Sequence, residues 1–194
     1  DGRNLPIYPT NGWWAELDLK KYGLGGMDTD YWQVTLDARR YQELGSAFNS
    51  LALYSLASLS TGEVGVDFPL YMQFNLGGAN SVRGWSLGSR DGKNQWINTL
   101  EYWRLLVDHQ KWKIWFFKFA MGLQLGVFGD AGVAWSESSQ FQQNWIGGGG
   151  VGLRLLVPAS VMFRFDVAGG ESGVGLGLFI SGREKAVAQR DRVR

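Results

Sequence analysis

The clearest pattern along the chain is a strict alternation of apolar with polar or small residues. In segment 115–127 every odd position is apolar, whereas the even positions include Lys118, Gly122 and Gln124. A period of two predicts a β-strand with one apolar face. The same alternation recurs in segments 13–20, 151–157, 161–168 and 173–180. A helix is disfavoured because Lys118, Gln124 and Asp130 recur every six residues and would not share one helical face.

These patterns predict eight strands. Their expected ranges are 12–22, 30–42, 47–58, 94–107, 112–135, 145–157, 160–169 and 173–182, of which 47–58 has the weakest alternation. Short connections near Gly45, near His109 and at Pro158 alternate with long ones at 23–29, 59–93 and 136–144, and a tight turn at 170–172 comes last. Short turns at one end and long loops at the other are typical of outer-membrane barrels.

Parity also predicts which side chains face inward. Those expected inside are Lys118, Gln124, Asp130, Arg164 and Asp166, and those expected to face lipid are Trp115, Phe119, Leu123, Phe163, Phe165 and Leu176. A slip of one residue would move every one of these charges into hydrocarbon.

Composition narrows the class of protein. The 194 residues carry 19 Lys and Arg against 18 Asp and Glu, so a net charge of +1 gives no reason to expect nucleic acid as a partner. The chain has no Cys, 28 Gly and 14% aromatic residues, which favours packed β structure over disorder. The longest apolar stretch, 114–135, is interrupted by Lys118, Gln124 and Asp130 and does not fit a membrane-spanning helix.

We therefore expect an all-β fold, a transmembrane antiparallel β-barrel in contact with outer-membrane lipid. The alternative is a soluble β-sandwich or lipocalin-like barrel. That alternative would turn the apolar stripes inward and leave nearly all of the glycines outside. A phosphate-binding loop is also disfavoured, because no Lys-Ser/Thr pair follows the glycines of segment 77–85. His109 is the only His, so neither a catalytic triad nor a His-based metal site has further members.

Four motifs carry a resemblance to a known family. Segment 77–85 reads GGANSVRGW and lies in the long loop 59–93. It resembles the Gly-Gly-x-x-Ser-Val-Arg-Gly-aromatic signature of the outer-membrane insertase and secretion superfamily of the BamA, TamA and FhaC type. Segments 8–13 (YPTNGW), 99–102 (TLEY) and 127–135 (VFGDAGVAW) are similar to further family motifs in the same order. The resemblance covers residues 5–182 and implies the C-terminal half of a sixteen-stranded barrel.

The resemblance implies a docking site between the loop and the inner wall of the barrel. Carried over by motif, Arg83 would meet Glu101 and Asp130, and Gly77, Gly78 and Gly84 would let the loop turn tightly and approach the wall. Parity independently places Asp130 on the inner face, whereas Glu101 faces inward only if Thr99 and Trp103 do too. The alternative is an ordinary surface loop with a solvated arginine. The glycines at 147–150 indicate a bulge, a close approach or simply a weakened strand.

The function implied by the resemblance is protein insertion into, or translocation across, the outer membrane. No enzymatic activity and no cofactor is expected, and the implied substrates are unfolded outer-membrane or secreted proteins. Two other functions stay open: a passive pore or structural barrel, and the membrane domain of a larger protein with a soluble part. Residues 1–182 are expected to form the membrane barrel, with loop 59–93 on the extracellular side, and the basic segment 183–194 is expected to be a periplasmic tail. Eight strands alone make a barrel too narrow to hold loop 59–93, so we expect pairing with a second copy or with an N-terminal barrel half. The alternative is a barrel of eight strands that closes alone, with the loop outside its lumen.

Overall fold

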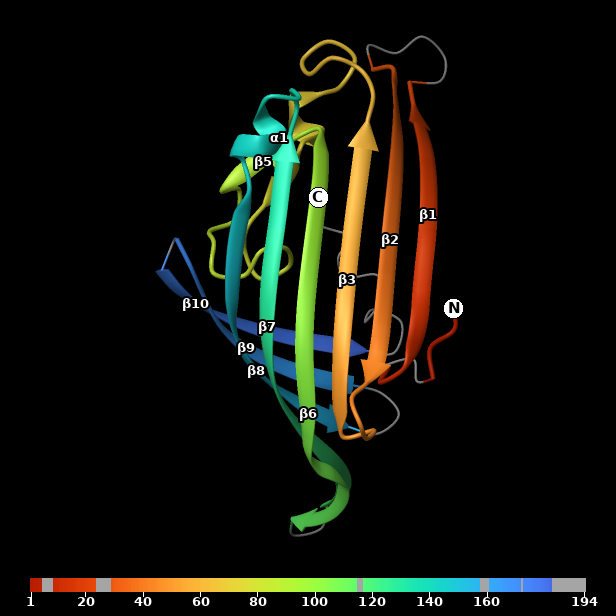
Figure 1. Ribbon diagram of the computed structural model, residues 1–194, viewed down its shortest axis with the longest axis vertical. Coiled ribbons are helices and arrows are strands. Elements are labelled where there is room, and N and C mark those ends of the chain that lie inside the picture. Colours follow the sequence, from red (N-terminus) through yellow and green to blue (C-terminus); the bar gives the residue numbers. More distant parts are fainter. Residues whose placement is uncertain (5–8, 24–28, 115–116, 158–160, 172, 183–194) are drawn as a thin grey trace.

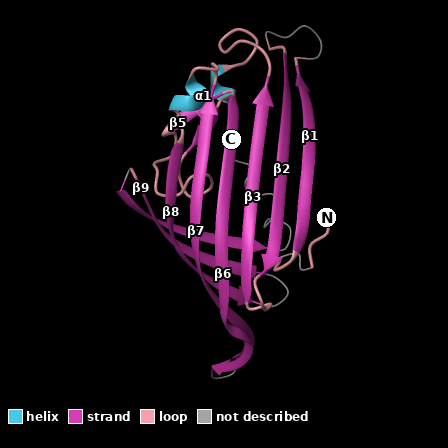
Figure 2. Ribbon diagram, in the orientation of Figure 1, coloured by secondary structure: helices cyan, strands magenta, loops and turns pink. Residues whose placement is uncertain are grey.

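The computed structural model describes residues 1–4, 9–23, 29–114, 117–157, 161–171 and 173–182. Most of them form one antiparallel sheet of eight strands (Figures 1 and 2). The strands, in spatial as well as chain order, are β1 (Gly12–Tyr22), β2 (Tyr31–Glu43), β3 (Asn49–Ser60), β6 (Asn94–Ile114), β7 (Phe117–Trp135), β8 (Ile146–Val157), β9 (Val161–Gly170) and β10 (Gly173–Gly182). The predicted all-β, antiparallel fold of about eight strands is confirmed.

The sheet is curved but not closed. In Figure 1, β1, β2, β3 and most of β6 and β7 run almost vertically, whereas β9 and β10 cross the view obliquely, so the sheet curls from one edge strand to the other. Among the described residues, β1 pairs only with β2 and β10 only with β9. The two edge strands therefore do not pair with each other, and the sheet is a partial barrel.

Side chains on the two faces of the sheet follow the predicted parity. Apolar side chains are exposed on the outer face, including Leu17, Leu36, Leu53, Leu100, Leu125, Val127, Val151, Phe165 and Val167. Polar side chains are buried on the inner face, including Asp37, Arg39, Glu101, Gln124, Asp130, Arg154 and Asp166. The predicted orientation is thus confirmed at Gln124, Asp130, Asp166 and Phe165. The structure does not describe the side chains of Trp115, Lys118, Phe119 and Leu176, so the predicted orientation is not tested at these four positions.

One predicted turn is wrong. The sequence indicated a turn near His109 between strands 94–107 and 112–135, but β6 continues through this position to Ile114. The pairing of β6 with β7 shifts register between Leu105 and Val107 and again between Val107 and Gln110. Bulges of this kind break the two-residue period without ending the strand. The other predicted strand ends agree with the structure to within about two residues.

The long loop between β3 and β6 has structure of its own. It contains a short 3₁₀ helix, η1 (Leu70–Met72), and a two-stranded hairpin, β4 (Phe74–Leu76) with β5 (Arg90–Gly92). The following long connection carries a single helical turn, α1 (Gln140–Gln143). No helix in the described part of the chain is long and apolar enough to span a membrane.

The loop packs against the inner face through a small hydrophobic core. Leu76 and Val82 from the loop join Leu56, Ile97, Ala134 and Ile146 from the strands, and Trp85 packs against this cluster. Leu76 and Val82 are completely buried, so the loop removes their apolar surface from water. The motif segment is therefore fixed to the wall by apolar contacts as well as by the polar contacts described below.

Candidate functional site: an arginine bound by the inner wall

The backbone of the motif segment 77–85 depends on its glycines. Gly77, Gly78 and Gly84 have φ angles of 107°, 79° and 90°, a region that side chains other than glycine rarely adopt. The amide of Gly78 donates to the carbonyl of Trp85 at 2.6 Å, which closes the segment into a compact loop. The hydroxyl of Ser81 donates to the carbonyl of Gly77 and accepts from its amide, so it holds the same turn from inside.

Glycines of the wall let this loop come unusually close. A Cβ atom at Gly148 of β8 would lie 1.9 Å from the carbonyl oxygen of Arg83. A Cβ atom at Gly84 would lie 2.4 Å from the carbonyl carbon of Gly169 in β9. The indole nitrogen of Trp85 then donates to the carbonyl of Gly147 at 2.8 Å. The glycine run in β8 is thus the site at which the loop backbone approaches the strand closely. Of the three interpretations that the sequence left open, the structure supports the close approach.

The side chain of Arg83 is surrounded by three carboxylates from three strands. Its Nε and Nη2 donate to the two oxygens of Asp130 in β7 at 2.6 and 2.8 Å, a bidentate arrangement. Its Nη1 donates to Asp166 in β9 at 2.8 Å, and its Nη2 lies 3.0 Å from Glu101 in β6. The backbone amide of Arg83 also donates to Asp130, at 3.1 Å. Every nitrogen of the guanidinium therefore has an anionic partner.

The wall holds these carboxylates through contacts of its own. Thr99 donates its hydroxyl to Asp130 at 2.7 Å. Glu101 accepts from Arg154 at 2.6 Å and from the indole nitrogen of Trp103 at 2.9 Å. These three partners all belong to strands of the sheet, so contacts within the wall, in addition to those of Arg83, orient Glu101 and Asp130.

The third carboxylate is held in the same way. Asp166 accepts a hydrogen bond from Nε of Arg164 at 2.8 Å, and Nη2 of the same arginine forms an ion pair with Asp166 at 2.7 Å. Nη1 of Arg164 lies 3.5 Å from Glu101, so this arginine links two of the three carboxylates. Three arginines and three carboxylates thus form one charge-balanced network on β6, β7, β8, β9 and the loop.

Burial makes this network strongly coupled. Arg83, Glu101, Asp130 and Asp166 are only 3%, 1%, 4% and 3% exposed. The guanidinium carbon of Arg83 also lies 3.4 Å from the ring centroid of Phe128, an additional cation–π contact. Burial alone would lower the pKa of Arg83, but its hydrogen bonds to Asp130 and Asp166 and the charge of Glu101 outweigh burial and raise that pKa. The arginine therefore stays charged in the docked state.

The structure brings together the six residues that the sequence singled out. Glu101 points inward together with Thr99 and Trp103, while the neighbouring Arg104 is exposed on the outer side. Sequence reasoning did not connect Asp166, Arg154 and Arg164 with Arg83, although parity placed Asp166 and Arg164 on the inner face. The alternation of polar and apolar residues in β8 and β9 indicated that these side chains face inward. It did not indicate which strands lie next to the loop.

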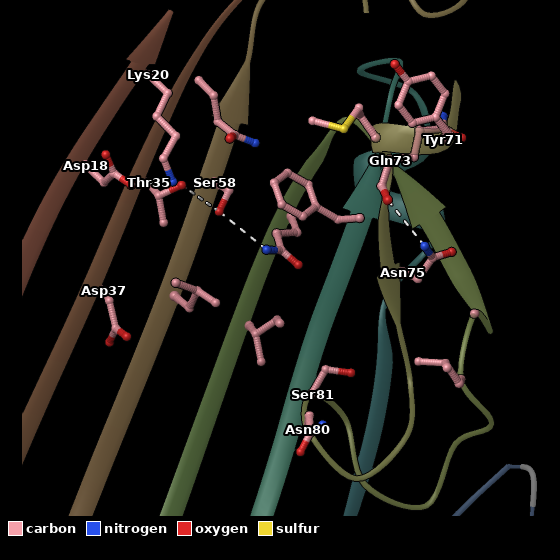
Figure 3. Close-up of a pocket in the computed structure, with 18 of the residues that line it drawn as sticks. Asp18, Lys20, Thr35, Asp37, Ser58, Tyr71, Gln73, Asn75, Asn80 and Ser81 are labelled. Atoms are coloured by element: carbon pink, nitrogen blue, oxygen red, sulfur yellow. Dashed lines mark hydrogen bonds and ion pairs between the residues drawn. The ribbon is translucent and has the colours of Figure 1, made fainter. Parts of the chain in front are cut away.

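A cavity of about 690 Å³ lies beside the docked loop (Figure 3). Polar side chains of β1, β2 and β3 line one side of it, and loop side chains such as Tyr71, Gln73, Asn75 and Asn80 line the other. Within it, the hydroxyl of Ser58 accepts from Thr35 at 3.1 Å and from Gln95 at 3.4 Å. The wall contacts of Arg83 and Trp85 are to β6–β9, whereas polar side chains of β1–β3 line the open space on the other side of the loop.

The described residues contain no group of three or more His, Cys, Asp or Glu side chains arranged to hold a metal ion. The three carboxylates that do converge are occupied by arginine side chains instead. The chemistry that this arrangement can perform is therefore recognition of a cation by carboxylates.

Comparison with known proteins gives the family. The Omp85 superfamily domain matches residues 1–170, and the chain belongs to this superfamily. The crystal structure of BamA from Haemophilus ducreyi lacking POTRA domains 1–3 has a similar fold, with a TM-score of 0.71 at 18% sequence identity. That match covers 94% of this chain and 40% of the BamA chain. No curated protein matches the sequence.

Family and fold together show what kind of protein this is. The chain is an outer-membrane protein, and its curved sheet forms part of a transmembrane β-barrel. The predicted membership of the BamA-type superfamily and the predicted outer-membrane location are thereby confirmed.

Proposed function

We propose that this chain is the loop-bearing part of a barrel that inserts proteins into, or translocates them across, the outer membrane. The barrel works without cofactor or enzymatic chemistry, and its substrates are unfolded outer-membrane or secreted proteins. Residues 1–182 form the membrane part, loop 59–93 regulates it from the lumen, and the basic segment 183–194, which lies outside the described residues, is a periplasmic tail. Membership of the Omp85 superfamily supports the general activity.

The observation that carries the proposal is the docking of Arg83 on three inner-wall carboxylates. These contacts hold the loop against the inner face through a buried ion network. Such networks are expensive to desolvate, and in several proteins they specify one conformation rather than add stability. We therefore assign Arg83, Glu101 and Asp130, with the turn glycines Gly77, Gly78 and Gly84, the role of fixing the loop in its working position.

The open sheet supports a role in handling β-strands. The outer edges of β1 and β10 have no strand partner among the described residues. Unpaired backbone groups in hydrocarbon are strongly unfavourable, so these edges pair with other strands in the membrane. A second copy of the chain or an N-terminal barrel half supplies these strands. An edge that pairs with a separate segment offers a seam at which a substrate strand can bind.

Reconstitution of the complete protein in lipid vesicles tests this function. The measurement is the rate at which an unfolded outer-membrane protein becomes folded and protease-resistant. We expect Arg83→Ala to lower this rate at least about tenfold, the factor that corresponds to about 1.4 kcal/mol. Arg40→Ala, which removes an exposed arginine from β2, is the matched control and should leave the rate unchanged.

Two other functions give different results in the same vesicles. A passive pore conducts ions but does not accelerate substrate folding, and Arg83→Ala would then change conductance alone. The membrane domain of a larger protein would show its activity only when a soluble domain encoded by the same gene is present. Wild-type protein that folds no substrate faster than empty vesicles do would overturn the proposal.

A further inference from the structure

Removing Arg83 from the network leaves a wall with one excess negative charge. The five remaining side chains are Glu101, Asp130, Asp166, Arg154 and Arg164, which carry three negative and two positive charges. The wall by itself is therefore complementary to one cation, and the docked loop supplies that cation. The excess charge lies in a site that is almost fully buried, where an unpaired carboxylate is unfavourable.

The shape of the site selects a planar cation. Asp130 receives two parallel N–H groups, Asp166 and Glu101 receive the outward N–H groups of the same plane, and Phe128 covers one side at 3.4 Å. A guanidinium matches this fork of carboxylates and stacks on an aromatic ring, whereas an ammonium is a compact point charge without a plane. Geometry and charge together specify a guanidinium group.

The wall also contacts the carboxylates through side chains that do not belong to the loop. Thr99, Trp103, Arg154 and Arg164 position the carboxylates, and all four residues belong to β6, β8 or β9. One oxygen of Asp166, Oδ1, is buried and has no hydrogen-bond partner among the described residues. These contacts do not involve Arg83, and Asp166 retains an oxygen that can accept a further hydrogen bond.

We infer that the inner wall is a preformed receptor for one guanidinium group, which an arginine from outside the loop can occupy whenever Arg83 does not. The docked loop is then one of several possible occupants. This inference rests on the docking of Arg83 but not on the insertion activity, because binding to the receptor can be measured without a substrate protein.

The test uses the complete Arg83→Ala protein, folded in detergent micelles, and measures its thermal unfolding temperature. Methylguanidinium, at concentrations well below those that denature, should raise this temperature saturably. A rise of about 2–4 °C is expected at roughly five times the dissociation constant. Methylammonium, which has the same charge but no plane, should give no rise. Equal stabilisation by both cations, or by neither, would overturn the inference.

Two further variants show where the cation binds. Wild-type protein should not respond, because Arg83 already fills the receptor. Arg83→Ala combined with Asp130→Asn should not respond either, because the wall then carries no excess charge and has lost the bidentate acceptor. A response of the double variant equal to that of Arg83→Ala would place the binding elsewhere. If Arg83→Ala does not fold alone, its folding yield with methylguanidinium, compared with methylammonium, decides the same question.

A second pair of probes separates a small cation from an arginine that is part of a polypeptide. N-acetylarginine amide carries the guanidinium on a peptide-like backbone, and N-acetyllysine amide is its control. Stabilisation of Arg83→Ala by the arginine amide supports occupation by a polypeptide side chain. Stabilisation by methylguanidinium but not by the arginine amide would restrict the receptor to small cations. It would overturn the inference that another arginine side chain can take the place of Arg83.

Discussion

Nε and Nη2 of Arg83 contact the two oxygens of Asp130 at 2.6 and 2.8 Å across a separation of 47 residues in the sequence. This bidentate pair ties the loop between β3 and β6 to the middle of the sheet. Because both partners are buried, removing either one leaves an uncompensated charge in a poorly solvated site. The pair therefore favours one loop position strongly, whatever its net contribution to the stability of the barrel.

Replacing Arg83 by Ala should release the loop from the wall. Breaking a buried ion pair by removing one partner typically costs roughly 3–5 kcal/mol. We expect protease to cut loop 59–93 of the Arg83→Ala protein in membranes much faster than that of wild type, while the strands stay protected. Arg40→Ala serves as the control because Arg40 is exposed on β2. Equal cutting rates in all three proteins would show that Arg83 does not hold the loop.

The glycine of β8 beneath the loop should be as important as the ion pair. A methyl group at Gly148 would lie 1.9 Å from the carbonyl oxygen of Arg83, so Gly148→Ala must displace the loop or the strand. We expect faster protease cutting of the loop in this variant, as for Arg83→Ala. Gly129→Ala is the matched control, since a Cβ atom there has no neighbour within 4 Å. Unchanged protection in Gly148→Ala would mean that the loop does not approach β8 this closely.

Most of the fold could be predicted because the two-residue period directly reports which face of a strand meets lipid. The prediction failed where this period is interrupted, at the register shifts around Val107 in β6. The period is also weak in β3, because Leu56 points inward to pack beneath the loop while Ser55 points outward. Contacts with a distant segment thus replace the usual division into an apolar outer face and a polar inner face.

The site could be predicted only in part. The motif identified Arg83, Glu101 and Asp130, and parity placed Asp130 inside. The bond from Arg83 to Asp166 depends on the curvature that brings β9 next to the loop, 83 residues later in the sequence. No local sequence pattern indicates a contact between two residues so far apart in the chain. The glycine run at 147–150 had no single local interpretation for the same reason, since its function is to accommodate a backbone from elsewhere in the chain.

The outward apolar face leads to a stability prediction. Val151 lies near the middle of β8 and is 51% exposed on the outer face. An arginine at this place would lie in hydrocarbon, where it costs roughly 2–4 kcal/mol near the bilayer midplane. We expect Val151→Arg to lower the urea concentration at which the barrel unfolds in lipid vesicles. Val66→Arg, at an exposed position of the loop, should leave it unchanged. Similar midpoints for the two variants would contradict the lipid-facing assignment of this face.

The two edges of the sheet lead to the last prediction. The chain has no Cys, so introduced cysteines report pairing without interference. Leu17 of β1 lies opposite Leu36 of β2, and cysteines at these two positions should crosslink within one chain. Cysteines at Leu17 and at Leu178 of β10 lie on opposite edges of the open sheet and should not crosslink within one chain.

The products formed by the second cysteine pair distinguish the ways in which the barrel can close. If the edges pair with a second copy, oxidation in membranes should give a covalent dimer, and a dimer linked through both edges should migrate as a single closed species. If an N-terminal barrel half supplies the missing strands, the two cysteines should not crosslink to each other, and each should crosslink only to cysteines placed in that half.

A monomer crosslinked between Leu17 and Leu178 would instead show that the eight strands close on themselves. A barrel of that size is filled by its own side chains and leaves no space for the loop. Arg83 would then lose its wall contacts, and with them the basis of the proposed function.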